Sequence, residues 1–196
     1  MKLVFATHNE NKVKEVQAML PQHISLLSLT DIGCNEDIPE TGKTLEENAI
    51  LKANYITQKF SYPCFADDTG LLVDALDGAP GVYSARYASD GRDANENMNK
   101  LLNELRDQKD RKAKFETVIA LNLKKEQYIF TGEVNGEIVY EKRGDKGFGY
   151  DPIFKPYGYS KTFAELPLVV KNKIGHRGRA IQKLILHLKS VAHVKE

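Results

Sequence analysis

Two adjacent carboxylates between two apolar runs place the strongest constraint on how this chain can fold. Asp67 and Asp68 follow the apolar run 63–66 and precede the apolar run 71–73. Neighbouring carboxylates repel each other and resist removal from water, so a fold that brings them near a core must compensate their charge. We interpret the segment 67–70 as an acidic turn. Its carboxylates form either a solvated polar turn or a site for a divalent metal such as Mg²⁺ or Mn²⁺, which prefer carboxylate oxygens.

A second polar segment follows the first predicted strand. Residues 2–6 indicate a short buried strand, and the apolar residues after them recur at helical spacing until Pro21. Residues 7–12 therefore form a strand-to-helix turn, whose backbone amides and helix dipole suit a phosphate, with Lys12 adding a positive charge. The alternative is an ordinary N-cap by Asn9 with Lys12 in solvent. The turn lacks the glycines of a P-loop.

The remaining segments predict alternating strands and helices. A capping box at residues 44–47 begins a helix with an apolar stripe. Asn48 and Lys52 near its start either point back into a cleft or are exposed, and we favour exposure. Asn135-Gly136 predicts a tight turn between strands. The other expected elements are strands over 24–29, 115–123, 127–134 and 137–140, and helices over 93–106 and from residue 175 onward.

Two segments near the C-terminal end carry groups suited to a nucleotide. The glycine-rich segment 144–154 contains Phe148 and Tyr150, either of which has a ring that can stack on a base. The alternative is a glycine-rich hairpin with core aromatic residues. His176 and Arg177 stand at the start of the last predicted helix, where cations oppose the helix dipole, so their placement favours an anionic or polar ligand.

Composition narrows the class of protein. The 196 residues have a formal net charge of +1, which provides no general attraction to nucleic acid or a membrane surface. Only two cysteines are present, and the apolar N-terminal run is too short for a signal peptide. These features predict one α/β domain over residues 1–196 in a reducing, cytoplasmic setting, with no nucleic-acid or membrane partner.

Five dispersed segments resemble, in order and spacing, the inosine/xanthosine triphosphate pyrophosphatases. They are Thr7-x-Asn9-x-x-Lys12, Glu40-Thr41-Gly42 with Glu47-Asn48-Ala49, Ala66–Gly70, Phe148–Pro152 and His176-Arg177-Gly178. The likeness extends from Leu3 to the C-terminal helix. It implies an elongated mixed-sheet α/β fold with two lobes around a central nucleotide-binding cleft, and a homodimer. The implied activity is hydrolysis of ITP, dITP or XTP to the monophosphate and pyrophosphate with Mg²⁺, for which Mn²⁺ can substitute.

The resemblance also implies roles for single residues. Asp68 matches the catalytic proton acceptor and a metal ligand, and Glu40 matches a second metal ligand. Asp67 stays open between a further ligand and a structural neighbour. The implied substrate-binding set is Thr7, His8, Asn9, Glu10, Asn11, Lys12, Thr69, Phe148, Gly149, Tyr150, Asp151, Lys171, His176 and Arg177.

The chain departs from the family pattern at two places. Gly175 stands where many relatives carry Ser, so a hydroxyl contact is absent, and the segment 166–170 is more apolar than usual. Two other functions remain open at this point: a pyrophosphatase for modified pyrimidine nucleotides, and a nucleotide-binding sensor without catalysis.

Overall fold

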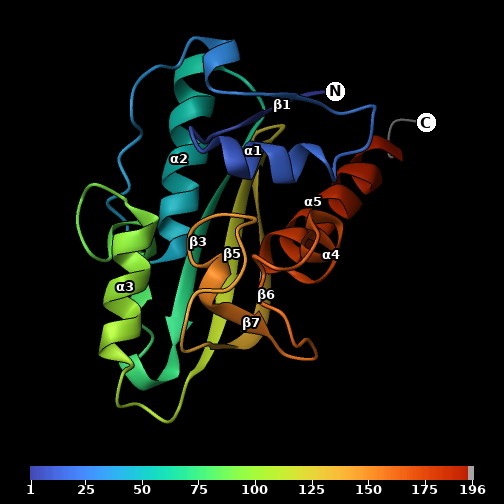
Figure 1. The fold of residues 1–196 in the computed structure, drawn as a ribbon. Helices are drawn as coiled ribbons and strands as arrows, with labels where there is room; N and C mark the ends of the chain where they lie inside the picture. Colours follow the sequence, from blue (N-terminus) through green and yellow to red (C-terminus); the bar gives the residue numbers. More distant parts are fainter. Residues whose placement is uncertain (194–196) are drawn as a thin grey trace. The chain divides into compact units, whose positions relative to one another are not determined.

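The computed structural model of the protein describes residues 1–193 (Figure 1). The chain divides into two compact units. Unit 1 comprises Met1–Asp68, Thr117–Gly132 and the chain from Arg177 onward. Unit 2 comprises Thr69–Glu116 and Glu133–His176. Three strands continue from one unit into the other. None of the helices in the described residues is long and apolar enough to cross a membrane.

The described strands form one mixed sheet in the order β2-β1-β3-β5-β6-β7, with β4 paired to β3. Strand β1 is parallel to β2 and β3, whereas β4 and β7 are antiparallel to their partners. The predicted α/β class and mixed sheet are therefore confirmed, while the two lobes around a cleft stay a prediction. The strands are β1 (Lys2–Phe5), β2 (Ser25–Leu27), β3 (Cys64–Val73), β4 (Pro80–Gly81), β5 (Lys112–Leu123), β6 (Glu126–Ile138) and β7 (Phe154–Pro156).

The helices that begin at Glu10, Leu45 and Ala94 each follow a capping side chain, whereas the helix that begins at Leu168 follows Pro167 and has none. Thr44 Oγ1 accepts a hydrogen bond from the Glu47 amide at 3.1 Å, and the Asp93 carboxylate accepts one from the Glu96 amide at 2.9 Å. The helices are α1 (Glu10–Gln17), α2 (Leu45–Phe60), α3 (Ala94–Glu104), α4 (Leu168–Ile174) and α5 (His176–His193), and the 3-10 helices are η1 (Thr30–Ile32), η2 (Asp74–Leu76), η3 (Ser84–Arg86) and η4 (Asp151–Ile153).

Unit 1 packs its helices on the strands through two apolar clusters. In one, α5 contributes a stripe that includes Ile181 and Leu184, and the rings of Phe5 and Phe65 stack at 4.5 Å. In the other, the small residues of α2 lie against β1 and β3, because alanine allows a helix to approach a sheet closely. This packing holds α2 beside β3 within unit 1.

Unit 2 has a separate core in which α3 packs on aromatic residues. Phe115, Phe154 and Phe163 form a cluster whose ring centroids lie 4.7–6.2 Å apart. Aromatic groups of this kind contribute large buried areas and favour offset or edge contacts. The core therefore anchors the glycine-rich segment from residue 144 onward, which includes Tyr150 as a core residue.

The acidic segment is not a turn, which corrects our interpretation of residues 67–70. Strand β3 runs without interruption from Cys64 to Val73. Successive side chains on a strand point to opposite faces, so Asp67 and Asp68 can each meet a different set of partners. Local composition suggested a turn because Asp and Gly are common in turns. The carboxylates instead pair with cations from other segments of the chain, and this tertiary contact favours the strand.

The turn predicted at Asn135-Gly136 is also wrong, because β6 continues to Ile138. Gly136 pairs with Pro156 of β7, and a Cβ atom placed on it would lie 2.7 Å from the Phe154 ring and would also collide with the carbonyl oxygen of Lys155. Glycine is therefore present for a close approach of two backbones rather than for a turn. The turn between β5 and β6 lies at Lys124-Lys125, both with positive φ (52° and 70°), where the strands predicted over 115–123 and 127–134 require one.

Gly136→Ala is expected to destabilise the protein by about 1–3 kcal/mol, because the added methyl group must push β6 away from β7. Urea denaturation measures the change in the free energy of unfolding. Asn135→Ala, at the exposed neighbouring position of the same strand, is the matched control and should change it by less than about 0.5 kcal/mol. Equal effects of the two substitutions would contradict the packing argument.

Candidate functional site

Asp67 lies in a buried chain of alternating charges. Its side chain is 1% exposed; Oδ1 accepts from Lys12 Nζ at 2.8 Å and Oδ2 from Arg177 Nε at 3.0 Å. Arg177 Nη1 in turn donates to Glu15 Oε2 at 2.5 Å. Two cations thus compensate two carboxylates within unit 1, which satisfies the rule that buried charges are paired.

These contacts decide the protonation state of Asp67. Burial raises the pKa of this carboxyl, but the positive charges of Lys12, Arg177 and Lys52 outweigh burial and hold its pKa well below 3.8. Burial also lowers the pKa of Lys12, although Asp67 opposes that change. Asp67 is therefore a carboxylate engaged with cations, and it is poorly suited to accept a proton from water.

Asp68 meets a different set of side chains. Its Oδ2 accepts from Asn48 Nδ2 at 3.1 Å, and its Oδ1 lies 3.8 Å from Lys52 Nζ. Burial raises the pKa of this carboxyl, and the charge of Glu40 raises it further, against the opposing attraction of Lys52. A carboxyl whose pKa is raised above its usual value is the better proton acceptor of the two.

Lys52 brings Glu40 and Asp68 to one point. Its Nζ donates to Glu40 Oε1 at 2.5 Å and to the carbonyl oxygen of Asp67 at 2.8 Å, in addition to its contact with Asp68. Within residues 1–193, no group of three or more His, Cys, Asp or Glu side chains is placed to hold a metal ion. Mg²⁺, however, binds through one or two carboxylates together with water and substrate phosphates, so Glu40 and Asp68 fit this ion.

The turn at residues 7–12 confirms the predicted N-cap by Asn9, while its role as a phosphate seat stays a prediction. Asn9 caps α1, its side-chain oxygen accepting from the amides of Asn11 and Lys12 at 3.0 and 3.3 Å, while its own amide donates to Thr7 Oγ1 at 3.1 Å. The expectation of Lys12 in solvent is wrong, since it is largely buried against Asp67. Glu10 begins α1, and His8 Nε2 lies 3.0 Å from the Glu36 carbonyl oxygen.

A second group of predicted residues gathers in unit 2. Asp151 Oδ2 accepts from Lys171 Nζ at 2.5 Å and from the Phe148 amide at 2.8 Å, and Lys171 Nζ lies 4.8 Å from the centre of the Phe148 ring. Gly149 has a φ of 62°, in the left-handed region that favours glycine. This arrangement presents the partly exposed Phe148 ring beside a buried ion pair.

Three further residues of the predicted set occupy well-defined places. Tyr150 is buried, and its hydroxyl donates to the carbonyl oxygen of Ser84 at 2.8 Å, so its ring serves the core. The His176 ring stacks on Phe115 at 4.5 Å. Thr69 continues β3 directly after Asp68. Of the two rings considered for base stacking, Phe148 is the one at the surface.

Three residues of these clusters were missed or misjudged from the sequence. Asn48 and Lys52, interpreted as exposed, are 1% and 7% exposed and contact Asp68. Glu15, which the sequence did not single out, is buried against Arg177. One signal was available: Asn48 and Lys52 are four residues apart, so they lie on the same face of α2, close in sequence to Glu40.

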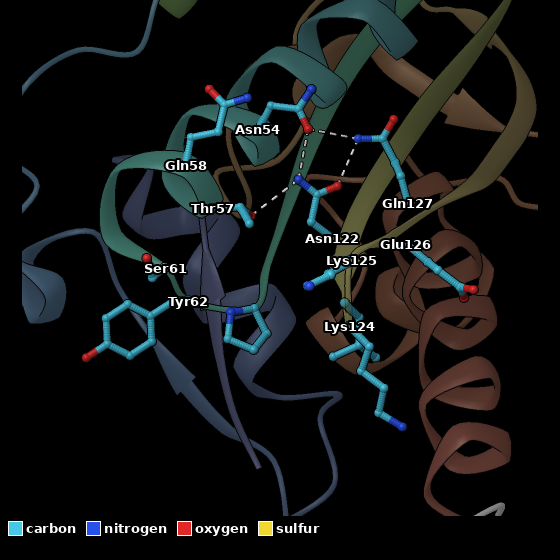
Figure 2. Close-up of a pocket in the computed structure, with 12 residues that line it drawn as sticks. Asn54, Thr57, Gln58, Ser61, Tyr62, Asn122, Lys124, Lys125, Glu126 and Gln127 are labelled. Carbon is cyan, nitrogen blue, oxygen red and sulfur yellow. Dashed lines mark hydrogen bonds between the residues drawn. The ribbon is translucent and has the colours of Figure 1, made fainter.

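A separate pocket lies at the other end of α2 and at the β5–β6 connection (Figure 2). Asn122 Nδ2 donates to Asn54 Oδ1 at 2.9 Å, and Gln127 Nε2 donates to Asn54 Oδ1 at 3.0 Å and to Asn122 Oδ1 at 2.8 Å. These side-chain amides satisfy one another. None of the predicted catalytic, metal-binding or substrate-binding residues lines this pocket.

The fold and the clusters around β3 define a mixed α/β protein with a buried carboxylate–lysine site suited to phosphate and a divalent metal. The model of the Ham1 family matches residues 3–187. The dITP/XTP pyrophosphatase of Flavobacterium johnsoniae is 64% identical over 185 residues, which cover 94% of this chain and 96% of the relative.

Solved structures lead to the same family. A Ham1 protein from Coxiella burnetii matches with a TM-score of 0.89 at 40% identity, covering 97% of this chain and 99% of that protein. The Ham1 protein of Staphylococcus aureus matches with a TM-score of 0.88 at 39% identity and the same coverage. This chain belongs to the Ham1 family, and the resemblance seen in its five sequence segments is confirmed.

Proposed function

We propose that this protein hydrolyses non-canonical purine nucleoside triphosphates, such as dITP, ITP and XTP, to the monophosphate and pyrophosphate. The names of its relatives support this substrate class. The observation that carries the proposal is the meeting of Glu40 and Asp68 at Lys52, with the pKa of Asp68 raised by burial. Unit 1 thereby combines two carboxylates that could bind a metal, Glu40 and Asp68, with the positive charge of Lys52, and Asp68 is also the proposed proton acceptor.

In the proposed mechanism, Asp68 accepts the proton of the water that attacks the α-phosphorus, and pyrophosphate leaves. Glu40 and Asp68 would hold Mg²⁺, which when bound neutralises charge on the phosphate oxygens. Lys12 would exchange its ion pair with Asp67 for one with the triphosphate, while Arg177 keeps Asp67 in place. Lys52 adds a second positive charge beside the reacting group.

The assignment of the base-binding residues is part of the same proposal. Phe148 offers a partly exposed ring for stacking, with Asp151 and Lys171 holding its loop. The resemblance assigns base binding to Arg177, whose hydrogen-bond donors would suit the 6-oxo group of hypoxanthine and xanthine and oppose the 6-amino group of adenine. In the structure its Nε and Nη1 donate to Asp67 and Glu15, so this role requires its remaining N–H groups. Thr7, His8, Asn9, Glu10 and Asn11 would surround the phosphates through the start of α1.

A homodimer is proposed from the resemblance alone, and a reducing, cytoplasmic setting is proposed from the presence of only two cysteines. Light scattering coupled to gel filtration measures the mass in solution. A mass of twice the 22.1 kDa chain would support the dimer, and a mass equal to one chain would contradict it.

A substrate panel tests the activity. Purified protein is incubated with dITP, ITP, XTP, ATP, GTP and modified pyrimidine triphosphates, with Mg²⁺, with Mn²⁺ and with a chelator, and pyrophosphate and phosphate are measured separately. We expect pyrophosphate from dITP, ITP and XTP with either metal, about 10²-fold less from ATP, and none with the chelator. Preference for modified pyrimidines, or binding without turnover, would support the two other functions instead.

A further inference from the structure

We propose that Asn48 is a positioning residue that sets the distance between Glu40 and Asp68. The role rests on the proposed function of these two carboxylates as metal ligands. Asn48 lies on the first turn of α2, is fully enclosed, and contacts both the segment after Glu40 and the carboxylate of Asp68. A single side chain therefore joins two parts of the chain that carry the proposed ligands.

The orientation of the Asn48 carboxamide follows from its two partners. Its Oδ1 accepts from the Gly42 amide at 2.8 Å, and its Nδ2 donates to Asp68 Oδ2 at 3.1 Å. A backbone N–H requires an acceptor, and a carboxylate requires a donor, so only this orientation satisfies both. The Gly42 contact thus directs the Asn48 amino group toward Asp68.

Glycine at position 42 allows this contact. A Cβ atom on Gly42 would lie 2.6 Å from Glu47 Cβ and 2.8 Å from Asn48 Oδ1. The next residue is held as well, because the Lys43 amide donates to Glu47 Oε2 at 2.5 Å. Residues 42–43 are thus fastened to the first turn of α2, and Glu40 stands only two residues earlier.

The two contacts of Asn48 bear directly on metal binding. Groups that orient metal ligands without touching the ion commonly change its affinity by about 10–100-fold when removed. Lys52 contacts both carboxylates through the end of a long side chain, whereas the Asn48 carboxamide is short and bound at both ends. Asn48 is therefore the group that fixes Asp68 against the Glu40 segment.

The test compares Asn48→Ala, Gly42→Ala and the double variant with Asn54→Ala. Asn54 is the matched control, because it is also a hydrogen-bonded asparagine of α2 but lines the separate pocket of Figure 2. Calorimetry measures the binding of Mn²⁺ to each protein without nucleotide, and hydrogen exchange measures protection of the Gly42 amide. Circular dichroism and a thermal melt verify folding, and Asn48→Ser replaces Asn48→Ala if the alanine variant does not fold.

We expect Asn48→Ala to weaken Mn²⁺ binding by about 10–100-fold and to remove protection of the Gly42 amide, with Asn54→Ala unchanged in both. Gly42→Ala should weaken Mn²⁺ binding similarly. The double variant should bind Mn²⁺ as well as the single variant with the lower affinity, because both substitutions disrupt one connection. If the losses of Mn²⁺ affinity added up in the double variant, Gly42 and Asn48 would not act through one connection.

Equal Mn²⁺ affinity in Asn48→Ala and Asn54→Ala would overturn the proposal, even if the wild-type protein hydrolyses dITP. Conversely, a selective loss of Mn²⁺ affinity in Asn48→Ala would support the positioning role even if no triphosphate in the panel were hydrolysed. The two readouts therefore distinguish failure of this inference from failure of the proposed function.

Discussion

Replacing Asp68 with Asn is expected to lower kcat for dITP and XTP by about 10²–10⁴-fold, the usual contribution of a positioned general base. The amide has the same shape but cannot accept a proton from the attacking water. Because burial raises the pKa of Asp68, neutralising this side chain removes little favourable charge interaction from the folded state. The thermal melt of Asp68→Asn should therefore remain within a few degrees of the wild-type value.

Asp37→Asn is the matched control for this experiment. Asp37 is an exposed aspartate of the same unit, in the segment that precedes Glu40. Its replacement makes the same chemical change and should leave kcat and KM within about twofold of wild type. Turnover of Asp68→Asn close to that of Asp37→Asn would refute the role of Asp68 as proton acceptor.

Replacing Asp67 with Ala, unlike replacing Asp68 with Asn, is expected to act on stability. We expect a loss of about 3–5 kcal/mol in the free energy of unfolding. The substitution removes the shared carboxylate from Lys12 and Arg177 and leaves their positive charges close together in a buried place. Urea denaturation measures the loss. Asp37→Ala, which removes an exposed carboxylate, should change the free energy of unfolding by less than about 0.5 kcal/mol.

The same ion pairs determine how stability depends on pH. The pKa of Asp67 in the folded protein lies below 3.8, its value in the unfolded chain. The stabilisation from this group is therefore fully present above a pH of about 4, and it is lost as the pH falls below that value toward the folded pKa. Asp67→Ala should accordingly show a weaker loss of stability than wild type as the pH falls below about 4, as thermal melts across this range will measure. If Asp67→Ala and wild type lost stability equally below a pH of about 4, the assignment of Asp67 as a carboxylate paired with cations would be contradicted.

Together, these two predictions separate neighbouring residues of one strand by their environments. Asp67 is surrounded by cations and is expected to act on stability, whereas Asp68 is desolvated and is the proposed proton acceptor. The sequence left the division of roles open, because two adjacent aspartates look alike until their partners are known. The alternation of side chains along β3 is what assigns each a different set of partners.

The sequence by itself determined much of this protein. Helical spacing and capping residues located α2, α3 and α5, and alternation located β5. The family was recognisable from five short segments, because their residue types, order and spacing can be read directly from the sequence. Lys12, Arg177, Glu40 and Asp68 were singled out from the sequence as candidate site residues, and in the folded protein they lie around Asp67 and Lys52 within unit 1.

Only the tertiary structure decided the state of the acidic segment and the identity of its partners. Asp67–Gly70 has the composition of a turn, and Asn48 and Lys52 have the composition of an exposed helix face. Their burial depends on one another: the carboxylates can enter a strand because Lys12, Arg177 and Lys52 are buried beside them, and the lysines are buried because the carboxylates are there. Such mutual compensation joins residues far apart in the chain, so no local pattern of residues reveals it.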